Sequence, residues 1–311
     1  MKKSAQTTVA LDLSPSSLKL AEFMPIENQI ISVVEMPLDP NQWGNDAYLR
    51  DALRNGLGNH VNAKHAEIIA AVAGEHALIR TLGIPLADDN IQDAIEWEME
   101  QYLNHPLGDY LMDWQAMGSN REETARLFLV AAFRRSEVMR LRQLIEATGH
   151  SLAVLDVDLF AAQNVFEINY PERLPLKTLL IKADAHSVKC ARIQDGGFVG
   201  CDICHVDEGL ADLSGMERLE RIRDMTREIH LIADRVQSDW GLEGCVVCGD
   251  LALDADFRTE LESGLPLEAM ALDSFRHIGL QTLPQAQADL MAAAPRYAGV
   301  VGLALRRGGD C

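Results

Sequence analysis

The chain has little positive charge and few aromatic side chains. Its 311 residues include 28 Lys and Arg against 47 Asp and Glu, which gives a net charge of −19, and only 5% are aromatic. A surface of that charge repels phosphate backbones and anionic lipid head groups, so we expect neither nucleic acid nor a bilayer surface as a direct ligand. The 22 Gly and 11 Pro are near average abundance and 48% of the residues are apolar, which excludes collagen-like, linker-like and disordered chains.

Long apolar runs are also missing. The longest, residues 68–73, 127–133 and 300–305, are far below the roughly 18–20 residues that cross a hydrocarbon layer, so we expect no transmembrane helix. The N-terminus has two lysines but only a short apolar stretch interrupted by Asp12, and we expect no secretion signal. Six cysteines in such a chain fit reduced thiols in a cytoplasm better than a disulfide framework.

Two Cys-x-x-Cys pairs, Cys201/Cys204 and Cys245/Cys248, have the spacing of a zinc or redox site. Both pairs lie in strand-like segments, where residues three apart point to opposite faces of a sheet. Neither pair has the glycine-rich knuckle or the helix N-terminus that lowers a thiol pKa. We therefore interpret them as structural cysteines and expect no metal site. The alternative, a zinc- or redox-controlled module, predicts stoichiometric zinc.

The hydrophobic pattern divides the chain into two halves that repeat one plan, a β-meander followed by a helix, a strand and a helix. In the first half we expect strands at 7–14, 17–23, 29–36 and 68–73 and a helix capped by Asn45. In the second half we expect strands at 178–183, 187–193, 198–206 and 245–248 and helices at 216–240, 254–264 and 296–306. Pro171 and Pro175 mark the boundary between a first domain, 1–174, and a second domain, 175–311.

A separate βαββαβ series interrupts the first half at about residues 77–157, and we predict that it forms an inserted α+β subdomain. Its expected strands are 77–84, 109–117, 125–133 and 151–157, and its expected helices are 89–103 and 136–148. Asp89 with Gln92 reads as a capping-box variant, and Ser214 with Glu217 as a capping box in the second half. The expected fold class is therefore α/β, with two related domains and an insert.

The strongest local motif is LDLSPSSLKLAEF, residues 11–23. A serine-rich turn between two strands can aim N–H groups and hydroxyls at one point, which suits a phosphate. In this interpretation Asp12 holds a water on Mg²⁺ and Lys19 neutralises charge; the alternative is an ordinary surface hairpin. Nine scattered histidines give no specific Ser/His/Asp arrangement, and we predict no catalytic residue.

Six segments, taken in order, resemble the PilM family, the actin-like cytoplasmic proteins of type IV pilus assembly, which are related to FtsA and to the cytoplasmic domain of the type II secretion protein GspL. The segments are LDLSPSSLKLAEF (11–23), IAAVAGEHALIRTLGIP (69–85), EWEMEQYLNHPLGDYLMDWQAMG (96–118), FLVAAFRRSEV (128–138), LDVDLFAAQNVF (155–166) and VVGLALR (300–306). The resemblance implies an actin/FtsA-like, ribonuclease H-like fold with two domains facing across a nucleotide cleft, and an insert at 77–157.

The resemblance also implies a function. By this resemblance the protein is an adaptor or scaffold in the cytoplasm. Its partner is the N-terminal tail of a PilN-like membrane protein, which holds it at the inner membrane. It is also expected to connect to other pilus platform and motor proteins. The tail is expected in a groove between the first subdomain and the insert, with Trp97 and Tyr102 as candidate contacts. A charge of −19 favours a tail that carries Lys or Arg, with apolar anchors deciding the affinity. A GspL-like secretion component is an alternative.

The nucleotide site that the resemblance implies departs from the family pattern. Its candidate residues are Asp12, Ser14, Ser16, Ser17, Lys19 and Gly249. The second phosphate loop, Asp-x-Gly-Ala in the family, is residues 182–185, Lys-Ala-Asp-Ala, so a lysine replaces the acidic residue expected near Mg²⁺ and a carboxylate replaces the glycine. The adenosine loop is Gly249-Asp250, and the Phe-Gly-Gly segment expected near residue 205 is missing. We predict a degenerate site; ATP and Mg²⁺ are cofactors only in the alternative, an active ATPase in which Lys182 contacts phosphate.

Overall fold

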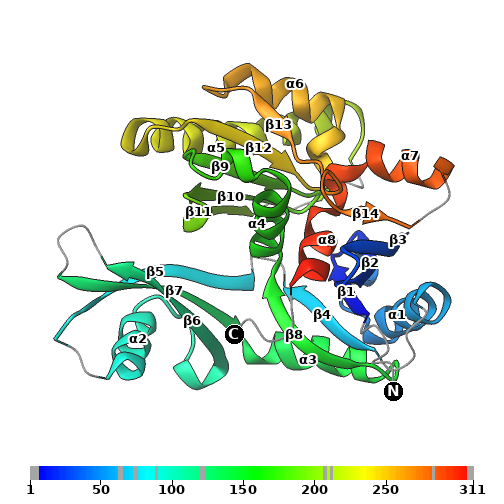
Figure 1. Ribbon diagram of the computed structural model, residues 1–311, viewed down its shortest axis with the longest axis horizontal. Helices are drawn as coiled ribbons and strands as arrows, with labels where there is room; N and C mark the ends of the chain where they lie inside the picture. The colour runs from blue at the N-terminus through cyan, green and yellow to red at the C-terminus, as the bar shows by residue number, and fades with distance from the viewer. Residues whose placement is uncertain are drawn as a thin grey trace.

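The computed structural model describes residues 7–61, 66–72, 76–87, 90–119, 124–205, 209–210, 213–281 and 284–306. The strands form three sheets, and a small unit projects to one side of two larger ones (Figure 1). Helices α4 (Asp158–Asn169) and α8 (Ala298–Leu305) lie between the two larger sheets. The apolar core around these two helices contains strand residues of both sheets, so the two domains share one core.

The first sheet has the strand order β14-β3-β2-β1-β4-β8. Its strands are β1 (Thr8–Leu13), β2 (Ser17–Met24), β3 (Gln29–Pro37), β4 (Glu67–Val72), β8 (Ser151–Val157) and β14 (Gly279–Leu280). Strand β2 pairs antiparallel with both β1 and β3, whereas β4 pairs parallel with both β1 and β8. Helices α1 (Asp46–His60) and α3 (Arg135–Glu146) bury leucines and an isoleucine against the face opposite α8, and the Asn45 side chain caps α1 as predicted.

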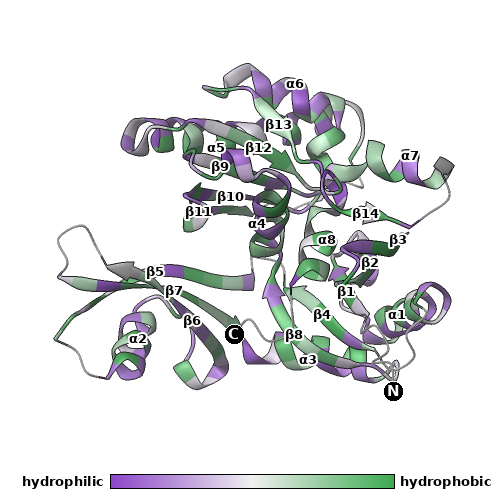
Figure 2. Ribbon diagram, viewed as in Figure 1, coloured by the Kyte–Doolittle hydropathy of each residue, from purple (hydrophilic) through white to green (hydrophobic). Residues whose placement is uncertain are grey.

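The second sheet has the order β11-β10-β9-β12-β13. Its strands are β9 (Thr178–Ala183), β10 (Ser187–Gln194), β11 (Gly197–His205), β12 (Gly244–Cys248) and β13 (Ala269–Ala271). Helices α5 (Gly215–Trp240) and α6 (Ala255–Gly264) cover its outer face. Helix α5 packs against the sheet through one continuous apolar stripe. Figure 2 shows the contrast between hydrophobic α8 and the hydrophilic outer surface of α6.

The third sheet, β5-β7-β6, is a separate unit with its own core. It consists of β5 (Ala77–Pro85), β6 (Tyr110–Ser119), β7 (Ala125–Arg134) and α2 (Ile91–Glu100). Short 3-10 turns at Pro40–Gln42, Leu107–Asp109, Pro171–Arg173, Asp250–Leu253 and Ala294–Tyr297, and helix α7 (Pro284–Ala292), complete the described elements. None of the described helices combines the length and apolarity needed to cross a bilayer.

Two expected boundaries differ from the structure. The insert was predicted at 77–157, but its sheet ends with β7; α3 and β8 belong to the first domain, because β8 pairs with β4 and α3 buries its apolar stripe there. The second domain was predicted at 175–311, but β14 pairs with β3 and α8 packs against β1 and β2. The end of the chain returns to the first domain because the edge of β3 and the apolar surface of α8 both find partners there.

Two capping predictions also change. Asp89 lies outside the described residues, and the cap of α2 is Asn90, whose side chain accepts a hydrogen bond from the Asp93 N–H at 3.4 Å. The capping-box prediction for Ser214 is wrong, since Ser214 precedes α5 but its side chain makes no capping hydrogen bond.

The two Cys-x-x-Cys pairs are divided between two cores, as their spacing in strands predicts. Cys248 packs in the core around α4 and α8, whereas Cys245 packs under α5, and Cys201 and Cys204 are divided in the same way. Burial raises the pKa of Cys245 to about 11 and that of Cys248 to about 12, which keeps both thiols protonated at neutral pH. Within the described ranges, no three His, Cys, Asp or Glu side chains are grouped so that they could hold a metal ion.

Candidate functional site

The serine turn that joins β1 to β2 is a tight hairpin whose hydroxyls bond within the turn. Ser14 Oγ accepts a hydrogen bond from the Ser17 N–H at 3.1 Å and lies 3.2 Å from the Ser17 hydroxyl and 3.4 Å from the Ser16 hydroxyl. Beyond the turn, Asp12 is directly opposite Lys19 in the strand register. The hairpin therefore presents one carboxylate and one ammonium toward the second domain.

Lys19 pairs with the second domain across the cleft between the two sheets. Its Nζ donates to Asp250 Oδ1 at 2.6 Å, and both side chains are largely buried. Asp250 follows Gly249, which has a φ of 96° and leaves no space for a side chain, since a Cβ there would lie 2.4 Å from the Ala183 carbonyl oxygen. Arg296 extends this contact, with its guanidinium 3.7 Å from Asp250 and 2.8 Å from Glu35 on β3.

A second group of charges lies deeper in the same cleft. Lys182 Nζ is 3.0 Å from Asp158 Oδ2, at the start of α4, and also pairs with Asp184. Lys189 Nζ, on β10, lies 2.7 Å from the same Asp158 oxygen. We call Lys19, Asp158, Lys182, Asp184, Lys189, Asp250 and Arg296 the cleft cluster. Its deeper side chains, those of Asp158, Lys182 and Lys189, are at most 6% exposed.

The pKa shifts follow from this burial and pairing. Burial alone raises the pKa of Asp158 and Asp184, but Lys182 and Lys189 overcome it and hold both carboxyl groups below their ordinary values. Burial lowers the pKa of Lys182, but Asp158, Asp184 and Asp12 more than offset this and raise it well above the ordinary value. Asp158, Asp184 and Lys182 are therefore charged at neutral pH.

Asp12 differs from the other carboxylates in the cleft. Burial raises its pKa, and the attraction of Lys182 and Lys19 only partly opposes this. Its Oδ2 lies so close to α8 that a Cβ at Gly299 would be 2.4 Å away. The Lys182 ammonium supplies positive charge beside it.

We expect Asp12→Asn to raise the free energy of unfolding at pH 7 and to change it little at pH 4. Burial raises the folded-state pKa of Asp12 above 3.8, so the folded protein favours the neutral carboxyl group. The stability that goes with the neutral form is fully present below pH 3.8 and is lost as the pH rises through the folded-state pKa. Asparagine is neutral at every pH and avoids this loss. Urea unfolding from pH 4 to pH 8 measures the difference, with the exposed Asp51→Asn as the control. Equal effects at all pH values, or a loss at pH 7, would contradict this interpretation.

The structure brings together most of the predicted nucleotide residues. Asp12, Lys19 and Gly249 converge on the cleft, Ser16 and Ser17 line a cavity of about 560 Å³ at its mouth with Glu35, Asp250 and Arg296, and Ser14 bonds within the turn. The sequence pattern did not indicate Asp158, Lys189 or Arg296 as part of this site. No local signal marks them, because each comes from a different element and meets the others only after folding.

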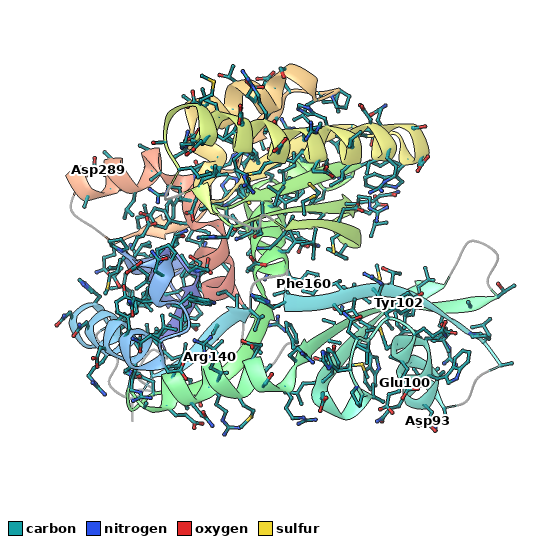
Figure 3. The ribbon with its side chains drawn as sticks, turned by 180° about the vertical axis from the view of Figure 1, so that it is seen from behind. Asp93, Glu100, Tyr102, Arg140, Phe160 and Asp289 are labelled. Carbon is teal, nitrogen blue, oxygen red and sulfur yellow. The ribbon has the colours of Figure 1, made fainter. Side chains whose placement is uncertain are left out.

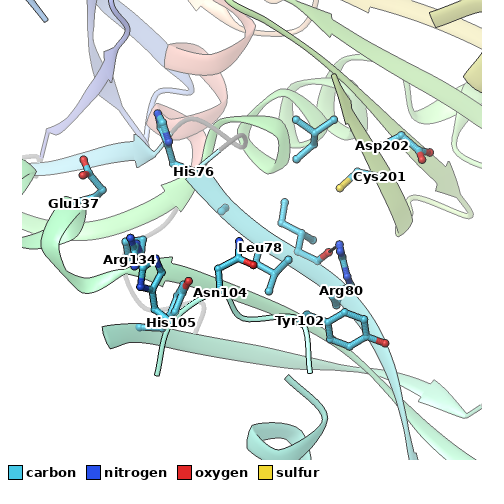
Figure 4. Close-up of a pocket in the computed structure, with 14 residues that line it drawn as sticks. His76, Leu78, Arg80, Tyr102, Asn104, His105, Arg134, Glu137, Cys201 and Asp202 are labelled. Atoms are coloured by element: carbon cyan, nitrogen blue, oxygen red, sulfur yellow. Dashed lines mark hydrogen bonds between the residues drawn. The ribbon is translucent and has the colours of Figure 1, made fainter. Parts of the chain in front are cut away.

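A larger groove of about 640 Å³ lies where the insert meets both domains (Figure 4). Tyr102, a predicted partner contact, lines it together with Arg80, Arg134, His105, Glu137 and Asp202. Trp97, the other predicted contact, does not line this groove; its side chain is 65% exposed on α2. Figure 3 shows Tyr102 beside β5, whereas Asp93 and Glu100 of α2 lie at the outer side of the insert.

Two similar sheets that pack on shared helices, with a cleft between their first hairpins, define a two-domain protein of the actin-like class. Several solved structures share this fold. A chain of a PilM–PilN type IV pilus biogenesis complex is 17% identical with a TM-score of 0.81, covering 98% of this chain and 99% of that chain. A Bacteroides thetaiotaomicron protein with an actin-like ATPase fold and unknown function is 12% identical, with a TM-score of 0.55 and coverages of 93% and 96%. The cytoplasmic domain of EpsL, an inner-membrane component of the Vibrio cholerae type II secretion system, is 11% identical, with a TM-score of 0.50 and coverages of 78% and 81%.

The sequence itself matches a family described as "Type IV pilus assembly protein PilM" over residues 10–181, more than half of the chain. The chain belongs to the PilM family of type IV pilus assembly proteins. This confirms the resemblance inferred from the six sequence segments and the actin-like fold expected from it.

Proposed function

We propose that this protein is an adaptor of the type IV pilus inner-membrane platform that binds the N-terminal tail of a PilN-like membrane protein and works without nucleotide turnover. The structural relative in a PilM–PilN complex supports the partner, and the groove beside Tyr102 offers a place for an extended tail. In this proposal the chain acts in the cytoplasm, is held at the membrane by its partner, and connects it to other platform and motor proteins.

The cleft cluster is the observation that supports the absence of turnover. Phosphoryl transfer needs a metal, a phosphate cradle and a positioned water at one site. Here two lysines of the second domain are paired with buried carboxylates, and Lys19 of the first hairpin is paired with Asp250. A triphosphate would have to break these pairs and would then face Asp184 and Asp250, which repel it.

Two experiments test the proposal. The full chain should co-purify with a synthetic peptide of the first 20 or so residues of the PilN-like protein of the same cell, and a scrambled peptide should not bind. Calorimetry with Mg-ATP should give no micromolar binding. Micromolar binding abolished by Asp12→Ala would contradict a degenerate site, and binding that instead depends on Lys182 would favour the alternative in which this lysine contacts phosphate.

A role in type II secretion is the second candidate, and the similarity to the EpsL cytoplasmic domain is the observation that favours it. The same pull-down distinguishes the two functions, because a secretion component would retain the cytoplasmic segment of a secretion-system membrane protein and not the PilN-like tail.

A further inference from the structure

The groove beside Tyr102 follows the free edge of a β-strand. β5 is the edge strand of the insert, since it pairs only with β7 in the described sheet. Four consecutive residues, Ala77–Arg80, line the groove. Because successive side chains of a strand point to opposite faces, and those of Ala77 and Ile79 are buried in the core, these residues can share one groove only through the strand's backbone edge.

The opposite wall is also an edge strand. β11 ends the five-stranded sheet of the second domain, and its consecutive residues 201–203 line the same groove. The Thr81 hydroxyl donates to the Val199 carbonyl oxygen at 3.2 Å, which holds the two strands together at one end of the groove. Figure 4 shows Cys201 and Asp202 on one side of β5 and Tyr102, Asn104 and His105 on the other. Unpaired N–H and C=O groups on such edges are a template for an added strand.

The charge of this groove is opposite to that of the whole chain. Arg80 and Arg134 line it, and among the described residues neither has a carboxylate within ion-pair distance. Each guanidinium instead lies over a tyrosine ring, Arg80 at 5.1 Å from the centre of Tyr102 and Arg134 at 5.7 Å from that of Tyr110. Of the two acidic side chains in the groove, Asp202 is already paired with Arg235 at 2.5 Å, which leaves Glu137 against two arginines.

Arg80 also covers the strand edge. Its Nη1 donates a hydrogen bond to the Ile79 carbonyl oxygen at 2.8 Å, next to the exposed side of β5. A ligand that offers Arg80 a carboxylate would replace this neutral acceptor with a charged one, and a hydrogen bond to a charged group is stronger. Binding would thus free the edge of β5 for pairing as it engages the arginine.

We propose that the partner tail binds as an extended strand along the free edge of β5 and that a carboxylate side chain of the tail pairs with Arg80 and Arg134. This inference rests on the proposed function and specifies the chemistry of its partner. The acidic group is a single one flanked by apolar or basic residues, because the remainder of a −19 protein repels a tail with several negative charges. Recognition at the groove therefore depends on the local charge, opposite to the Lys- or Arg-bearing contact that the net charge predicts.

Calorimetry of the full chain with the synthetic tail peptide tests this. Replacing the acidic residue of the peptide by Gln should weaken binding by about 10- to 100-fold, the range expected for a hydrogen bond to a charged group. Arg80→Ala and Arg134→Ala should each weaken it by about 10-fold, and a Lys in the peptide should recover part of the affinity only against Arg80→Glu. Arg227→Ala, a change of the exposed Arg227–Asp224 pair on α5, is the matched control and should leave the affinity unchanged.

The backbone contact has its own test. N-methylation of alternate peptide bonds of the tail removes the donors that pair with β5 on one register and should abolish binding, whereas methylation of the other register should be tolerated. If the wild-type chain binds the tail but the arginine, Gln and N-methyl variants bind equally well, or if the tail contains no acidic residue, this inference is overturned and the adaptor function stands. If the wild-type chain does not bind the tail at all, the adaptor function itself fails.

Discussion

Lys182→Met lowers the free energy of unfolding by about 3–5 kcal/mol, the cost of leaving buried carboxylates without their counter-charge. Methionine has a similar length to lysine, so the substitution removes charge while nearly keeping volume. Asp158 keeps its contact with Lys189 at 2.7 Å, whereas the Lys189 ammonium lies 3.9 Å from Asp184. Urea unfolding followed by circular dichroism at pH 7 measures the change.

The matched control for this substitution is Arg54→Met, which removes a cation from the exposed Arg54–Asp51 pair. An exposed ion pair contributes about 0–1 kcal/mol because water solvates both partners after it is broken. A loss below about 1 kcal/mol for Lys182→Met would show that water reaches the cleft cluster, and it would remove the main argument that the cluster takes the place of a ligand.

Gly302→Ala destabilises the protein by about 3 kcal/mol or more, because it forces apart the two helices between the sheets. A Cβ at Gly302 would lie 1.7 Å from the Ala161 carbonyl oxygen of α4, which is backbone and cannot turn away. Helices α4 and α8 are part of the core that both domains share, so their separation disturbs both sheets. The same urea titration measures the loss.

Gly58→Ala in α1 is the control for a glycine in a helix without a close neighbour, since no atom of the described residues outside the helix backbone lies within 4 Å of a Cβ at that position. Alanine has the higher helix propensity, and we expect a gain of about 0.5–1 kcal/mol. A Gly302→Ala protein as stable as the wild type would show that α4 and α8 separate at little cost, against the close packing of the shared core.

The cleft shows why charge is hard to assign from a sequence. The sequence alone shows that Lys182 and Asp184 replace the acidic residue and the glycine of the second phosphate loop, and these replacements predict a poor phosphate site. The pairing of Lys182 with Asp158, and of Lys19 with Asp250, joins residues 24 and 231 positions apart, for which no periodicity or spacing gives a signal. Likewise, the resemblance predicted Tyr102 as a partner contact, but Arg80 on β5 and Arg134 on β7 reach the same groove without any such signal.

The sequence by itself determined most of the strands and helices, the α/β class and the family, because apolar periodicity, turn residues and ordered motifs are local properties of the chain. Its excess of acidic residues determined the sign of the long-range field. Only the tertiary structure decided to which domain β8, β14 and α8 belong, because free strand edges and apolar faces find their partners in space. It also decided the local charge. Buried lysines neutralise the acidic cleft, and two arginines make the groove positive in a chain of charge −19. The reason is that the electrostatic interaction depends on the distance between charged side chains, which the fold sets and the composition does not.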